Sequence, residues 1–142
     1  MGDMDDPYEL SRFVAAQEYS YAEALSELRA GVKRSHWMWY VFPQIAGLGR
    51  SSMAERYAIR SLDEARAYLQ HPVLGARLLE CADALLADTT HTAAQILGDI
   101  DALKLRSSMT LFAHAEPAER RFTRVLDRFY DGLEDTETVR RL

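Results

Sequence analysis

The sequence predicts an all-α protein, a single compact domain of about seven to nine short helices over residues 1–142. Three observations predict this fold class. Apolar residues recur at steps of three and four along most of the chain. Serine, glycine and proline stand where helices would begin and end. No segment combines sustained apolar–polar alternation with hairpin turn residues, as strands would require. We expect residues 1–7 to be flexible.

The first two helices are predicted between residues 10 and 31. One short face is formed by Leu10, Phe13, Val14 and Gln17. Ser20 and Glu23 have the spacing of a capping box, so a second helix should begin there. Gly31 is a natural end for that helix, because glycine readily adopts the left-handed conformation that follows a helix.

The middle of the chain predicts two further helices around Pro72. Ser61 and Glu64 repeat the capping-box spacing. The helix that they open should end near His71, because Pro72 cannot continue it and instead suits the first turn of the next helix. A stripe with steps of three and four follows on that next helix, formed by Leu74, Leu78, Cys81, Ala82, Leu85 and Leu86.

The last third of the chain continues the helical pattern. A polar link, 88–92, precedes a short helix around residues 93–97, which should end at Gly98. Another apolar segment spans residues 103–112. Pro117 should start a final amphipathic helix, whose apolar side carries Phe122, Val125, Leu126, Phe129 and Leu133.

The segment from Trp37 to Phe42 is rich in aromatic residues, and its pattern fits two structures. Aromatic residues favour strands, whereas the helical surroundings favour a short buried helix. We predict the helix, ending at Phe42 because Pro43 follows. The next residues, GLGRSS, predict a glycine-containing loop before a helix that begins near Met53. Ser51 or Ser52 would cap that helix.

Composition excludes several classes of protein. The net charge is −5 and the pI is about 5.3, which argues against broad binding to nucleic acid or to anionic membranes. The single cysteine, Cys81, excludes an internal disulfide and a thiolate-rich zinc site. The four histidines lack metal-ligand spacing, so we expect no bound metal. We also expect no cofactor. No apolar run approaches a membrane span, and the acidic start lacks a signal peptide, so we expect a cytoplasmic protein.

Three Arg–Ser pairs form the most suggestive pattern for a binding site. They are Arg34–Ser35, Arg50–Ser51 and Arg106–Ser107, each beside an apolar helical segment. Two of the three pairs have a lysine nearby, Lys33 and Lys104. A guanidinium group and a hydroxyl group together suit the recognition of phosphate. The alternative is that the pairs are solvated helix ends that do not meet in space.

The residues around the first pair extend this hypothesis. Trp37, Trp39 and Tyr40 could offer a stacking surface for a base, or could simply be core residues. His36 is the candidate for proton transfer, since it stands between Ser35 and the aromatic residues. Gln44 is a candidate polar residue for orienting a ligand. Whether the protein catalyses a reaction is left open by the sequence.

Long stretches of the sequence resemble a known family. These are LRAGVKRSHWMWYVFPQIAGLGRSSMAERYAI, EARAYLQHPVLGARLLEC and DALKLRSSMTLF. They are similar to the uncharacterised bacterial DUF family 1810, which sometimes carries the label calpastatin. The resemblance implies a mainly helical domain of unknown function and supplies no activity or catalytic residues. The chain contains none of the short repeated inhibitory segments of a true calpastatin.

Two functional hypotheses follow. The first is a cytoplasmic protein that binds a small phosphate-bearing ligand such as a nucleotide or nucleotide-sugar, held by the three Arg–Ser pairs and stacked on the aromatic residues. The second is a protein-interaction or regulatory module without a small-molecule ligand, in which the arginines pair with carboxylates. The two hypotheses differ in whether the three pairs face one concavity.

Overall fold

A computed structural model describes residues 6–142, and it confirms the all-α prediction. Six of the ten helices in this part of the chain have seven residues or more. The helices are α1 (Ser11–Gln17), α2 (Tyr21–Ala30), α3 (Met38–Val41), α4 (Ser52–Arg56), α5 (Leu62–Gln70), α6 (Leu74–Ala87), α7 (Ala93–Leu97), α8 (Asp99–Ala115), α9 (Arg121–Tyr130) and α10 (Thr136–Arg140). The expected flexibility of residues 1–7 falls mainly on residues 1–5, which lie outside the described residues.

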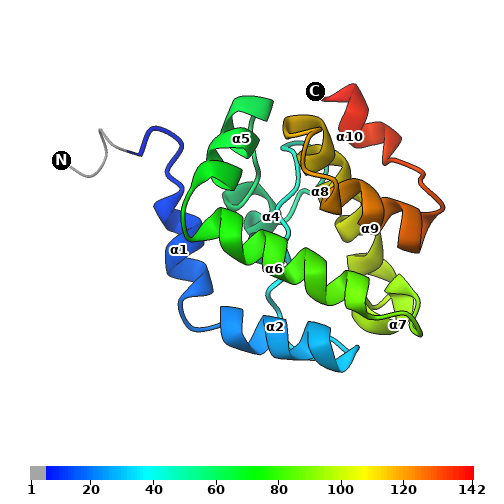
Figure 1. Ribbon diagram of the computed structural model, residues 1–142. Helices are drawn as coiled ribbons and strands as arrows, with labels where there is room; N and C mark the ends of the chain where they lie inside the picture. Colours follow the sequence, from blue (N-terminus) through cyan, green and yellow to red (C-terminus); the bar gives the residue numbers. More distant parts are fainter. Residues whose placement is uncertain (1–5) are drawn as a thin grey trace.

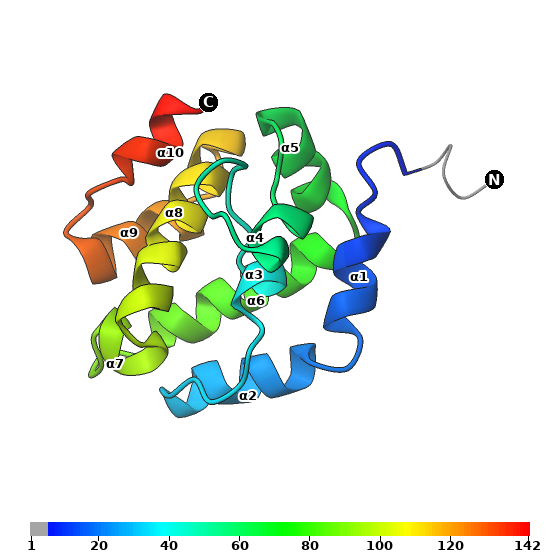
Figure 2. The same ribbon diagram turned by 180° about the vertical axis from the view of Figure 1, so that it is seen from behind.

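Helices α6 and α8 are the two longest and organise the domain (Figure 1). Helix α6 packs against α2, α5 and α9, and α8 packs against α5, α7, α9 and α10. The view from behind shows α3 and α4 with their connecting loops on the opposite side from α6 (Figure 2). The chain leaves α2 close to α7, where the Lys33 amide donates to the Ile96 carbonyl at 2.6 Å.

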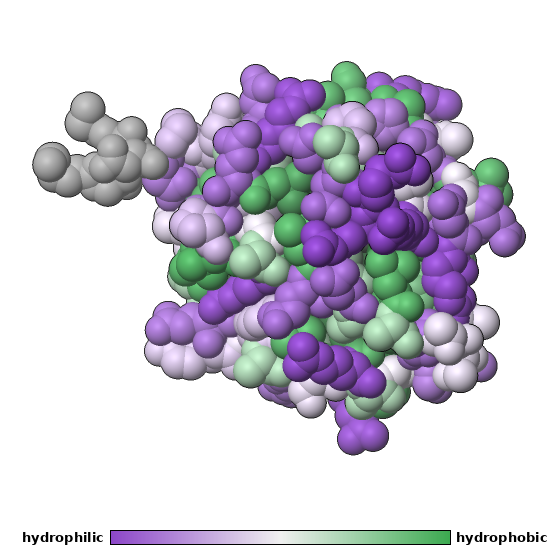
Figure 3. Space-filling view, in the orientation of Figure 1, coloured by the Kyte–Doolittle hydropathy of each residue, from purple (hydrophilic) through white to green (hydrophobic). Residues whose placement is uncertain are grey.

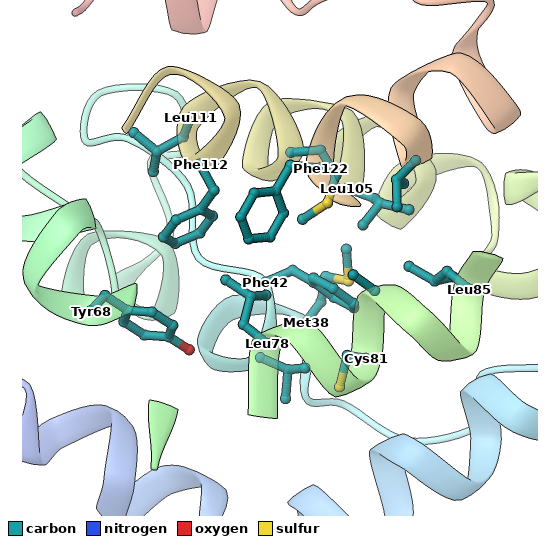
Figure 4. Packing of buried hydrophobic residues seen from close by; sticks show 14 of the residues in the cluster. Met38, Phe42, Tyr68, Leu78, Cys81, Leu85, Leu105, Leu111, Phe112 and Phe122 are labelled. Carbon is teal, nitrogen blue, oxygen red and sulfur yellow. The ribbon is translucent and has the colours of Figure 1, made fainter. Parts of the chain in front are cut away.

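The aromatic segment forms the short buried helix α3, as predicted. Figure 4 shows Met38 and Phe42 between the side chains of α6 and those of α8 and α9. Both side chains are almost completely buried, and so is Trp37. The backbone leaves helical geometry at Phe42, the residue before Pro43. This segment is therefore a central part of the core, while His36 just before it is exposed and Gln44 after it is half-buried.

The leucine stripe of α6 faces the core, also as predicted. Leu74, Leu78 and Leu85 are fully buried, and Cys81 lies among them (Figure 4). Burial raises the pKa of the Cys81 thiol to about 12, which keeps it protonated at neutral pH. We therefore assign this cysteine to packing.

The predicted capping boxes are only partly formed. Helix α2 begins after Ser20, but the Ser20 hydroxyl donates to the Ala16 carbonyl instead of capping. The Ser61 hydroxyl accepts from the Glu64 amide, as expected at α5. The Glu64 carboxylate turns away from Ser61 and binds the Arg12 guanidinium at 2.8 Å. A complete capping box occurs where none was predicted, between Thr92 and Gln95 at the start of α7.

Pro72 and Pro117 lie further from the starts of the helices that follow them than predicted. Helix α6 begins at Leu74, two residues after Pro72, and α9 begins at Arg121, four residues after Pro117. Helix α9 ends at Tyr130, where Asp131 adopts a left-handed conformation. Leu133 therefore lies beyond the helix and is exposed, although the apolar periodicity placed it on the buried face. The periodic pattern continued past the true end of the helix.

Candidate functional site

The first Arg–Ser pair surrounds a carboxylate of the protein itself. Glu27 Oε1 accepts from the amides of Arg34 and Ser35 at 2.8 and 3.0 Å. The buried Trp37 indole donates to the same oxygen at 2.9 Å. The Ser35 hydroxyl lies between the carboxylates of Glu27 and Glu23. These donors form an anion-binding nest, and Glu27 fills it.

The environment of Glu27 keeps its side chain ionised. Burial by itself would raise the pKa of this carboxyl. The hydrogen bonds from Ser35, the Arg34 amide and the Trp37 indole outweigh burial and lower the pKa to about 2. The anion bound by the amides of Arg34 and Ser35, the Ser35 hydroxyl and the Trp37 indole is therefore internal, and the Arg34 guanidinium takes no part in binding it. Trp37 has no face free for stacking.

The third Arg–Ser pair ties α8 to the segment before α10. Arg106 Nε donates to the Leu133 carbonyl at 2.8 Å, and Arg106 Nη2 donates to the Glu134 carbonyl at 2.7 Å. The Ser107 hydroxyl donates to Asp135 Oδ2 at 2.9 Å. The donors predicted to hold phosphate thus hold two carbonyl groups and one carboxylate of the chain.

The second pair, Arg50–Ser51, lies at the start of α4. The Ser51 hydroxyl accepts from the Ala54 amide at 3.1 Å, which confirms the predicted cap. Arg50 is exposed. A side chain at Gly49 would bring its Cβ within 2.6 Å of the Ala54 Cβ, so glycine allows the loop to lie against α4. The three pairs lie on different elements. Within residues 6–142, Arg34, Arg50 and Arg106 are absent from the linings of the cavities beside Trp39, between α2 and α6, and around α1. The positions of the three pairs therefore do not support the prediction that they bind one shared anion.

The lysines that accompany two of the pairs do converge. Lys33 and Lys104 are the only lysines of the chain. Lys33 Nζ lies 3.0 Å from Asp101 Oδ2, and Lys104 Nζ lies 3.4 Å from Asp101 Oδ1. The Lys33 ammonium lies 5.1 Å from the ring centroid of Trp37, and the Lys104 ammonium lies 5.0 Å from that of Trp39. We call these five residues the Lys–Trp cluster.

The Lys–Trp cluster carries an excess of positive charge. Two ammonium groups share one carboxylate, so one unit of positive charge is left without a partner inside the cluster. The Lys33 side chain is only 9 % exposed and that of Asp101 18 % exposed, which reduces screening by water. The sequence pattern predicted that the arginines bind a phosphate group, and it did not identify Asp101 as the residue that pairs with both lysines. The signal that could have identified the cluster is the presence of only two lysines against fifteen arginines.

A cavity of about 530 Å³ opens beside the cluster. Its lining includes Lys33, His36, Trp39 and the first residues of α8. The residue before that helix is Gly98, and no side chain in the described part of the chain caps the helix there. The positive end of the helix dipole and its first amides therefore face the same region as Lys33 and His36. Asp99, in the same wall, opposes this charge.

Trp39 also lines a second, smaller cavity of about 180 Å³ on its other side. This cavity lies between the glycine loop and α4, and Gln44, Gly47 and Arg60 belong to its wall. Gly47 has a φ of +97°, so a residue with a side chain would be strained there. A parallel bridge between Ile45 and Ile59 holds this loop in place. Trp39 and Gln44 are thus brought to one cavity, and Trp39 and His36 to the other.

Tyr40 supports the fold around the site more than the site itself. Its hydroxyl oxygen lies 3.0 Å from the Ser20 hydroxyl oxygen and donates to the His36 carbonyl at 3.3 Å. Its own carbonyl accepts from Gln17 at 2.7 Å. Tyr40 therefore fixes the backbone at His36 and is absent from the lining of both cavities.

Two further observations bear on the expected classes of partner. Among the described helices, none combines the length and the apolar character of a membrane span. Within residues 6–142, no group of three or more histidine, cysteine, aspartate or glutamate side chains could hold a metal ion.

Comparison with known proteins identifies the family to which the chain is similar. The model of the family described as "Protein of unknown function (DUF1810)" matches residues 7–142. The crystal structure of the conserved hypothetical protein Rv1873 from Mycobacterium tuberculosis is similar to the whole domain, with 52 % sequence identity and a TM-score of 0.95. The match covers 96 % of this chain and 98 % of that one. No curated protein matches the chain.

Proposed function

The chain belongs to the DUF1810 family, whose description names no activity, and we propose from the geometry of the Lys–Trp cluster that it binds a small phosphate-bearing ligand there. The phosphate would lie in the cavity lined by Lys33 and His36, near the first amides of α8. An aromatic base, as in a nucleotide or nucleotide-sugar, would lie against Trp39. This proposal keeps His36 and Trp39 from the predicted site and replaces the three Arg–Ser pairs by the two lysines.

The single observation that carries the proposal is the pairing of both lysines with one carboxylate beside both tryptophans. An anion can bind this cluster without displacing Asp101, because two cations share that one carboxylate. The half-buried Trp39 also presents indole surface to the cavity. His36 lies in the cavity wall and is the residue that could exchange a proton with the ligand. We place this activity in the cytoplasm, whose reducing conditions suit a chain with one free, buried thiol.

Isothermal titration calorimetry with ADP, pyrophosphate and adenosine tests the proposal. We expect ADP to bind at least tenfold more tightly than adenosine, because the phosphates supply the charge that the lysines recognise. Lys104→Met should weaken ADP binding at least fivefold, since it removes one ammonium group and keeps the apolar stem. Arg50→Met is the matched control and should leave binding unchanged, because Arg50, unlike Lys104, does not pair with Asp101 and adds nothing to the charge of the cluster.

Two results would contradict the proposal. One is equal affinity for ADP and adenosine, which would remove the role of the phosphates. The other is an equal loss of affinity in Lys104→Met and Arg50→Met, which would indicate nonspecific attraction of anions to the surface.

A second candidate function, a protein-interaction module, is favoured by exposed apolar side chains on α8. Ile100 is 72 % exposed and Leu103 is 65 % exposed. These residues are three apart on one helix and so lie on the same face, and adjacent exposed apolar side chains that form a patch mark contact surfaces. A protein that binds none of the three compounds and self-associates in analytical ultracentrifugation, with the association lost in Leu103→Ser, would favour this function over the first.

A further inference from the structure

A histidine on the link between α6 and α7 is held in one orientation by an aspartate. His91 Nδ1 lies 2.8 Å from Asp88 Oδ2. The other carboxylate oxygen of Asp88 accepts from the amides of Thr90 and His91, each at 3.0 Å. The carboxylate is therefore fixed by the backbone of the link, and it fixes the imidazole ring in turn.

Two other elements hold the same link. From α9, Arg128 Nη2 donates to the carbonyls of Asp88 and His91 at 3.0 and 2.9 Å. From the end of α2, Gly31 leaves room for the ring, since a Cβ there would lie 2.8 Å from His91 Nδ1 and Cε1. The imidazole thus rests on the backbone of α2's last turn and cannot move toward it.

The protonation of the pair follows from these contacts. Burial would raise the pKa of Asp88, but hydrogen bonds from the amides of His91 and Thr90 and from the imidazole outweigh it and lower the pKa to about 2. An ionised carboxylate only accepts hydrogen bonds, so His91 Nδ1 must carry a proton. In the neutral imidazole the lone pair is then on Nε2. The His91 side chain is 44 % exposed, so this nitrogen is reachable by a small molecule.

His91 lies in the wall of a cavity of about 590 Å³ between α2 and α6. Hydrophilic side chains cover much of the face that includes α2 and α6 (Figure 3). Glu80, Asp83 and Asp88 line this cavity, and Arg29 is the one basic side chain in its lining. Asp83 is paired with Arg121 at 2.9 Å. Glu80 Oε1 accepts from the Tyr21 hydroxyl, and the contact between Glu80 Oε2 and Arg29 is loose, at 3.8 Å. The carboxylates outnumber the basic groups that pair with them in the lining, which favours a cation over an anion.

We propose that this cavity is a second binding site, in which His91 Nε2 accepts a hydrogen bond from a small organic cation that carries N–H or O–H donors. Glu80 would pair with the positive charge, and Asp88 would hold the imidazole in the accepting tautomer. A protonated amino alcohol has this chemistry. The site is independent of the Lys–Trp cluster, because the two share no residue.

NMR of the histidine side chains tests the proposal, with ethanolamine as the probe and glycolate as a control of similar size and opposite charge. At a pH where the imidazoles are neutral, long-range ¹H–¹⁵N spectra of the free protein should show His91 protonated at Nδ1. Ethanolamine should shift the His91 Nε2 resonance in a saturable way, and glycolate should leave it in place. His114, which contacts Glu134 elsewhere on the molecule, is the internal control and should not respond.

Variants separate the site from general surface binding. Asp88→Asn should weaken ethanolamine binding at least threefold, and His91→Gln at least tenfold, whereas His114→Gln should leave it unchanged. A proton on His91 Nε2 in the neutral free protein would overturn the proposal, and this measurement needs no variant to fold. Equal responses of His91 to ethanolamine and glycolate, or no response to either, would overturn it as well.

Discussion

Replacing Glu27 with alanine is expected to lower the free energy of unfolding by about 3–5 kcal/mol, as measured by urea denaturation. The carboxylate accepts from two amides, the Trp37 indole and the Ser35 hydroxyl. Its removal leaves these donors without an acceptor in a region where Glu27 itself is only 8 % exposed. Unsatisfied buried donors cost far more than an average hydrogen bond contributes.

The neighbouring Glu23 provides the control. It lies on the same helix, is exposed, and contacts the Ser35 hydroxyl alone at 2.5 Å. Glu23→Ala should therefore change the free energy of unfolding by less than about 1 kcal/mol. Equal effects of the two substitutions would show that Glu27 does not fill a nest of donors.

The stabilisation by Glu27 should also depend on pH in a defined direction. Its pKa is lowered from 4.5 to about 2 in the folded protein. A lowered pKa contributes stability that is complete above the unfolded value and is lost as the pH falls toward the folded value. The difference in stability between the parent protein and Glu27→Gln should therefore shrink between pH 5 and pH 2. Comparing two variants at each pH cancels the titration of the other carboxyl groups.

Replacing Gly75 with alanine is expected to destabilise the protein by about 3 kcal/mol. In most helices this substitution stabilises, because glycine is a poor helix former. Here a Cβ on Gly75 would lie 2.0 Å from the carbonyl oxygen of Leu69 and 2.8 Å from its carbonyl carbon. Both atoms belong to the backbone of α5, so the two helices must separate to admit one methyl group.

The adjacent residue shows the ordinary rule and serves as the control. Ala76 is exposed on the same helix, so Ala76→Gly should cost about 1 kcal/mol through helix propensity alone. Chemical denaturation of both variants gives the comparison. An increase in stability in Gly75→Ala would contradict the close approach of α5 and α6 at this corner.

The fold was predictable where local chemistry and periodicity agree. The α6 stripe was identified by its steps of three and four, and the end of α2 by Gly31, which has a φ of +81°. Ser20 has capping-box spacing yet does not cap, because its hydroxyl binds Ala16 and Tyr40. Competition of this kind depends on residues from another helix, which spacing along the chain does not encode.

The candidate site was predictable in its chemistry but not in its partners. The Ser35 hydroxyl does bind an anion, as its residue type indicates, but the anion is Glu27 on the preceding helix, and Arg34 contributes only its backbone amide. Arg106 was expected to bind phosphate and instead binds carbonyl groups beyond α9. Phosphate, carboxylate and carbonyl oxygens all accept hydrogen bonds from the same donors. Only the folded arrangement decides which of them is in reach.

The most direct test of the central claim, that the Lys–Trp cluster and not the Arg–Ser pairs holds the ligand, is an ADP titration followed by backbone amide NMR. The account predicts saturable shifts concentrated at residues 33–39 and 97–104, with the amides of Arg50, Ser51, Arg106 and Ser107 moving little. Saturable shifts at all three Arg–Ser pairs would contradict this account and support the phosphate site that the sequence predicted. A spectrum that ADP leaves unchanged would contradict a phosphate-binding function for this cluster.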